Sequence, residues 1–127
     1  MHDVEPLDVN PLVEAADSLA DRFRSLPQSK LLGAVPGHPS RAAAALELAR
    51  RLAGLALAAE DGPRREFPDA GAFAVGDQLA VAAHDLAAAL AALPQGAEVA
   101  LPEGPVAAAE VLAGAVAAVR ETAALCG

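Results

Sequence analysis

Four stretches of the chain repeat apolar residues at the spacing of an amphipathic helix, with polar residues between them. In the first stretch, residues 10–26, one stripe holds Leu12, Ala16, Leu19, Phe23 and Leu26. Acidic residues occupy the opposite face. Asn10 and Pro11 are typical of a helix start, and Pro27 predicts the end of this helix.

The other three stretches predict helices of similar length. The second covers residues 40–60, with Ser40 as its cap. The third begins at Asp69 or Ala72 and ends at Leu93, and the fourth begins at Glu103 or Pro105 and ends at Leu125. Linkers of roughly 8–13 residues, rich in proline and glycine, separate the helices.

The pattern predicts an all-α fold, an antiparallel four-helix bundle in which residues 1–127 form a single helical domain. Residues 1–9 are acidic and lack an apolar period, so they predict a loose arm. Within the third helix, Gly71 and Gly76 cost helical stability, and we expect a cap, a kink or close approach of a facing helix to compensate.

Alanine changes what this bundle can be, since it supplies 35 of the 127 residues. Alanine favours helix but buries little apolar area, so an alanine-rich core is thin. Residues 72–93 and 103–125 are apolar around most of the helix, which indicates that they are covered on several sides. We therefore expect a homodimer through these two helices, or a helical protein partner; the alternative is that exposed alanine merely fills helix positions.

The charge balance excludes some partners. Nine basic and 17 acidic residues give a net charge of −8, which argues against binding to nucleic acid or to an anionic membrane surface. The longest apolar segment, residues 70–93, is interrupted by Asp77 and Asp85 and does not predict a membrane span. The first residues lack the pattern of a signal peptide, so we expect a cytoplasmic protein.

Six residues are candidates for a binding site. Four come from the third helix and its start, and two from the loop that opens the second: Asp69, Asp77, His84, Asp85, His38 and Arg41. Free amides at the second helix start, beside Arg41, could hold a phosphate or carboxylate. The alternative for the third helix is a solvated polar stripe or a polar link between helices.

The sequence gives little support for a metal site or a catalytic nucleophile. Asp77 and His84 are seven residues apart, about 10.5 Å along a helix, which is too far for one metal ion. Cys126 is the only cysteine and has no base near it in sequence. The sequence therefore predicts no metal, no cofactor and no catalytic residue.

One motif resembles that of a known family. Glu14-Ala15-Ala16-Asp17 resembles half of the Mg²⁺ motif of the all-α nucleotide pyrophosphatases similar to MazG. Those enzymes need a second acidic pair on a neighbouring helix, where this chain offers Glu47 alone, followed by two arginines. The acids of the first helix are therefore interpreted as a solvated face.

The sequence favours a protein–protein interaction or oligomerisation module over an enzyme. The alternative is a small-ligand binder or enzyme with a site between helices around Asp77 and His84. A site would require these two side chains to point into a cleft with polar residues of another helix. An interaction module would leave them on a rim or on open surface.

Overall fold

The computed structural model describes residues 7–62 and 67–127. Its helices are α1 (Asn10–Ser25), α2 (Gln28–Leu31), α3 (Arg41–Ala59), α4 (Val75–Ala91) and α5 (Ala108–Cys126), and a 3-10 turn, η1 (Ala72–Ala74), leads into α4. Two strands, β1 (Glu98–Leu101) and β2 (Gly104–Ala107), form a small antiparallel hairpin. The described part of the chain is thus mostly helical, as predicted.

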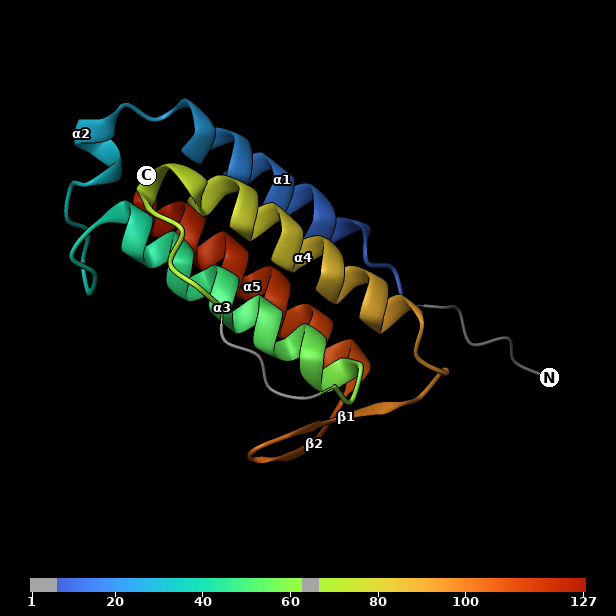
Figure 1. The fold of residues 1–127 in the computed structure, drawn as a ribbon. Coiled ribbons are helices and arrows are strands. Elements are labelled where there is room, and N and C mark those ends of the chain that lie inside the picture. Colours follow the sequence, from blue (N-terminus) through green and yellow to red (C-terminus); the bar gives the residue numbers. More distant parts are fainter. Residues whose placement is uncertain (1–6, 63–66) are drawn as a thin grey trace.

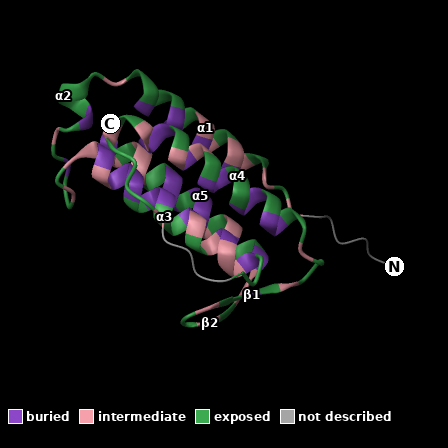
Figure 2. Cartoon of the chain, viewed as in Figure 1, coloured by how far each residue is buried: buried purple, intermediate pink, exposed green. Residues whose placement is uncertain are grey.

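The long helices of the described residues, α1, α3, α4 and α5, lie side by side (Figure 1). Both α4 and α5 pack against α1 and against α3, but they make little contact with each other. They therefore lie at opposite corners of the arrangement. The buried residues form one core cluster between the helices, visible as the purple segments of Figure 2.

The helix directions differ from simple alternation. Arg24, late in α1, contacts Asp77, early in α4, so these helices are antiparallel. The Arg41 side chain at the start of α3 reaches the carbonyl oxygen of Cys126 at the end of α5, so α3 and α5 are antiparallel as well. However, α3 and α4 run in the same direction (Figure 1), so the antiparallel prediction does not hold for this pair.

The connection from α3 to α4 accounts for the parallel pair. Figure 1 shows its described part after the gap, residues 67–71, running back along the helices before η1 and α4 begin. Its described part is held by Arg50, whose Nε donates to the carbonyl oxygen of Phe67 at 3.2 Å, and by Gln78, whose amide donates to that of Pro68 at 2.8 Å. Periodicity along single helices carries no information about such a return, so the sequence could not predict it.

The first helix follows its predicted stripe but not its predicted cap. Leu12, Ala16, Leu19 and Phe23 are buried, and Leu26 is partly buried. The cap position is Val9 rather than Asn10, and the backbone N–H of Asn10 donates to the Asp8 carboxylate at 3.1 Å. The α3 cap is as predicted, because the Ser40 hydroxyl accepts the backbone N–H of Ala43 at 3.0 Å.

The predicted loose arm is wrong at its described end. Leu7 and Val9 are partly buried against the core, so the chain is already packed before α1 begins. Residues 1–6 of that predicted arm lie outside the described residues.

The prediction that the last helix begins at Glu103 or Pro105 is also wrong. Both residues belong to the hairpin, and α5 begins at Ala108. Leu101 pairs with Gly104, whose φ of +125° suits glycine and closes a two-residue turn. Val99 faces Val106 across the hairpin and is buried, which fixes the hairpin to the helices.

The core is more complete than the alanine content indicates. Its largest fully buried side chains are leucine and valine, and it contains no buried polar residue among those described. The described residues expose three large apolar side chains, Leu32, Phe73 and Val81. No helix in this part of the chain combines the length and apolar character needed to cross a membrane.

Candidate functional site

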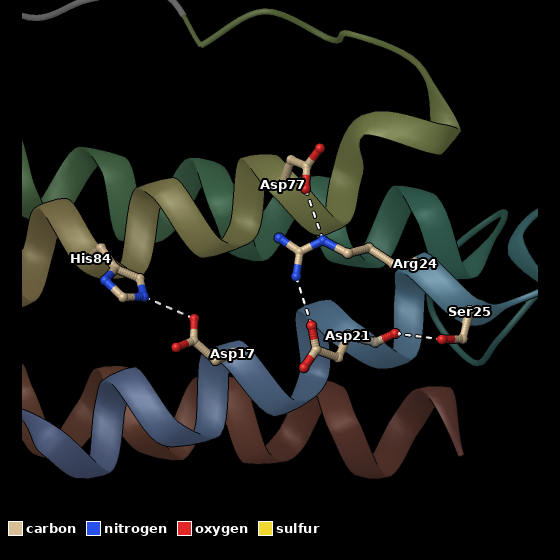
Figure 3. A network of polar contacts seen from close by, with 6 residues as sticks. All are labelled: Asp17, Asp21, Arg24, Ser25, Asp77 and His84. Carbon is tan, nitrogen blue, oxygen red and sulfur yellow. Dashed lines mark hydrogen bonds and ion pairs between the residues drawn. The ribbon is translucent and has the colours of Figure 1, made fainter.

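A row of polar contacts joins α1 to α4 on the surface (Figure 3). His84 Nε2 lies 2.8 Å from Asp17 Oδ1. About two helical turns away, Arg24 bridges the helices, because its Nε donates to Asp77 and its Nη1 donates to Asp21, both at 2.8 Å. The predicted residues Asp77 and His84 therefore share a face with polar groups of another helix.

The electrostatics of this row are those of an exposed network. Hydrogen bonds to Asp77 and then to Asp21 raise the pKa of Arg24, which stays positively charged. The side chain of Asp77 is 74% exposed and that of His84 is 52% exposed. Exposed pairs contribute about 0–1 kcal/mol to stability, so this row adds little to the packing of α1 on α4.

The remaining third-helix candidates do not complete a site. The Asp69 carboxylate accepts the backbone N–H of Gly71 at 2.9 Å, which shapes the turn before η1. Asp85 is exposed on α4. The sequence grouped these carboxylates with Asp77 and His84, but Asp69 has a local role in the loop before η1.

The two candidates from the loop before α3 also have structural contacts. Arg41 donates from Nε to the carbonyl oxygen of Cys126 at 2.9 Å and from Nη1 to that of Lys30 at 3.1 Å, so it caps the end of α5 and fastens the α2 loop. His38 Nδ1 lies 3.2 Å from Glu47 Oε2. Neither residue belongs to the α1–α4 row.

Two hollows lie elsewhere on the described surface. One, of about 360 Å³, lies between α1 and the end of α5 and is lined by Leu19, Asp21, Arg22, Phe23, Ser25, Leu26, Cys126 and Gly127. The other, of about 100 Å³, includes His38, Glu47 and Arg51. Asp69, Asp77, His84 and Asp85 line neither hollow.

Metal and thiol chemistry also lack a prepared site. In residues 7–62 and 67–127, no group of three or more His, Cys, Asp or Glu side chains could hold a metal ion. Cys126 is buried, and this burial raises the pKa of its thiol even though the charges of Arg41 and Arg22 lower it.

Two apolar residues that were not among the six candidates lie four residues before and after Asp77: Phe73 in the 3-10 turn η1 and Val81 in α4. Phe73 is 72% exposed and Val81 is 59% exposed. Positions 73, 77, 81, 85 and 88 follow helical spacing and all are exposed. We call these residues the outward stripe: Phe73, Asp77, Val81, Asp85 and Ala88. Their shared spacing with Asp77 was the signal that could have identified Phe73 and Val81 in advance.

Comparison with known proteins adds no family to this description. A scan of protein-family models and searches of curated proteins and solved structures found no match to the chain.

Proposed function

We propose that this protein is a helical interaction module, a four-helix bundle that binds a protein partner through the outward stripe, which runs from η1 into α4. The observation that carries the proposal is the exposure of Phe73, in the η1 turn, and of Val81, eight residues later in α4. The same chain buries most of its other large apolar side chains.

The energetics favour a binding role for these two side chains. Burying a phenylalanine or valine side chain contributes about 1.5–3 kcal/mol, and this gain is unused while Phe73 and Val81 face water. A partner that covers both would gain that energy at one interface. Exposed aromatic side chains beside polar residues are also typical of interface centres.

The positions of α4 and α5 limit which helix can form the proposed interface. The sequence pointed to a homodimer through residues 72–93 and 103–125 together, but α4 and α5 lie at opposite corners. The exposed positions of α5 hold alanines and charged residues: Ala109, Glu110, Ala113, Ala117, Arg120, Glu121 and Ala124. We therefore propose α4 as the docking helix, with a second copy or another protein's helix as its occupant.

A cytoplasmic setting is part of this proposal. Cys126 is a free, buried cysteine, which is compatible with a reducing compartment. The net charge of −8 supports a protein partner rather than a nucleic acid or an anionic membrane.

A ligand or substrate site around Asp77 and His84 is less well supported. Both side chains are largely exposed, and neither lines either of the two hollows described above. An interaction role needs these groups on open surface, at the rim of an apolar contact.

Position-specific photocrosslinking in the native host tests the proposal. A photoreactive residue replaces Val81 in the stripe or, as a matched control, the exposed Ala117 of α5. We expect a discrete crosslinked product from position 81, absent from position 117 and lost when Phe73→Asp is added. Equal products at both positions, or none from position 81, would contradict it.

A further inference from the structure

We infer that the occupant of the outward stripe is a basic amphipathic helix of another protein, rather than a second copy of this chain. This inference rests on the proposed function and adds the chemistry of the partner. Three features of the described surface support the inference. They are the negative charge beside the stripe, the spacing of its apolar residues and the electrostatic repulsion that two copies of the same face would experience.

The α1 side of the stripe is strongly acidic. Asp17 and Asp21 meet α4 through His84 and Arg24, and Glu14 lies one turn from Asp17 on the same exposed face of α1. Together with Asp77 and Asp85 they make five carboxylates. The cations among them are Arg24 and, when protonated, His84.

The charge of this surface selects the partner's charge. Five carboxylates against one guanidinium leave a formal charge of −4 with His84 neutral. Arg24 is already engaged by Asp21 and Asp77, whereas Glu14 and Asp85 are exposed toward the other end of the row, near the contact between Asp17 and His84. Lysine or arginine on a partner helix would meet these carboxylates across the rim, which speeds association and adds specificity.

The apolar spacing selects the partner's secondary structure. Phe73 lies in the 3-10 turn η1 and Val81 lies eight residues later, within α4, so at a rise of about 1.5–2 Å per residue they stand roughly 13 Å apart along the helix direction. An apolar stripe on a second helix reaches both, because its side chains recur every three or four residues and cover the same length. Asp77 lies between the two anchors and contacts Arg24 through Oδ1 only, so its exposed carboxylate could also receive a basic residue from the partner's flank.

A second copy fits this surface poorly. In a two-fold dimer the same face meets itself, so the carboxylates of one copy would approach those of the other. Like charges brought together at an interface are destabilising and act against the wrong partner. Each copy would bring only one phenylalanine and one valine to the centre of such a dimer, together with its own five carboxylates at the rim.

Binding of two synthetic helical peptides tests the inference with the full-length, isotopically labelled protein. Both peptides carry the same leucine stripe; one has lysine and the other has glutamate at the remaining positions. Amide chemical shifts locate the binding site, and titrations at low and moderate salt give the affinities. We expect the leucine–lysine peptide to shift Phe73, Val81 and Asp85, with salt-sensitive affinity, and the leucine–glutamate peptide to cause no shift.

Variants separate charge from apolar contact. Val81→Asp should lower the affinity for the leucine–lysine peptide by roughly tenfold or more, because it removes an apolar anchor. The double variant Glu14→Lys, Asp85→Lys should lower the affinity for this peptide by a similar factor, although both apolar anchors remain. Ala117→Asp, on exposed α5, is the matched control and should leave the affinity within about twofold.

The possible failures are distinguishable. Equal binding of both peptides at the stripe would overturn the basic partner but leave the proposed function standing. A different outcome is a dimer, seen in sedimentation, that the Val81→Asp change dissociates. That result would also overturn the basic partner and leave the proposed function standing, because the occupant would be a second copy of the chain. Lysine-peptide shifts spread over the surface, unaffected by Val81→Asp, would overturn the inference, and absence of any crosslink from position 81 would overturn the proposed function itself.

Discussion

Gly76 shows how one residue decides the distance between two helices. A Cβ atom at this position would lie 3.0 Å from the carbonyl oxygen of Ala20 and 3.1 Å from Cγ of Arg24. The absence of a side chain therefore lets α1 approach α4 closely and brings Arg24 within reach of Asp77. Close approach of a facing helix was one of the expectations for Gly76, and it is confirmed.

We predict opposite effects for two Gly→Ala changes. Gly54→Ala should raise the free energy of unfolding by about 0.5–1 kcal/mol, because a Cβ there meets nothing within 4 Å and alanine favours helix. Gly76→Ala should instead lower it by about 1 kcal/mol, because overpacking against α1 outweighs the helix preference. Urea unfolding followed by circular dichroism measures both, and a Gly76→Ala protein as stable as Gly54→Ala would contradict the close approach.

Cys126 gives a second prediction, on pH and reactivity. Burial raises the pKa of its thiol, so the folded state holds the thiol proton more tightly than the unfolded state. This contribution to stability is present below the ordinary thiol pKa and is lost as pH rises through the raised one. At pH 8 we expect slow alkylation by iodoacetamide in the folded protein and fast alkylation in urea. Equal rates in the two states would show that the thiol is accessible.

The hydrophobic period of the sequence predicts the long helices but not the β-hairpin. The long helices were predictable because their apolar positions recur at helical spacing, as with Leu12, Leu19 and Phe23. The hairpin was missed because each strand has four residues and alanine and proline interrupt the alternation. Its turn signal, Gly104 after Pro102 and Glu103, was assigned instead to a helix start.

At this scale we predict that Val99 holds the hairpin to the helices. It is 2% exposed, so Val99→Ala should lower the free energy of unfolding by about 1–2 kcal/mol through lost burial and a small cavity. Ala100→Ser, the exposed neighbour on the same strand, should change it by less than about 0.5 kcal/mol. Similar stabilities for both variants, compared by thermal unfolding, would mean that the hairpin is not packed as described.

For the whole molecule, the sequence predicted the helical class but not the directions or the polar partners. The parallel pair α3 and α4 depends on a return connection that leaves no periodic signal. The same limit applies to the candidate site. Asp77 and His84 were found on the sequence, but their contacts with Arg24 and Asp17 follow from the antiparallel packing of α1 on α4.

The central claim is that the fold is complete without the outward stripe, which leaves Phe73 and Val81 for a partner. The free energy of unfolding of the double variant Phe73→Asp, Val81→Asp tests it most directly, with Leu86→Ala in the core of the same helix as the comparison. We predict that the double variant stays within about 0.5 kcal/mol of the unchanged protein, whereas Leu86→Ala loses about 2–5 kcal/mol. A double variant destabilised as much as Leu86→Ala would show that the two side chains serve the fold and would contradict the account.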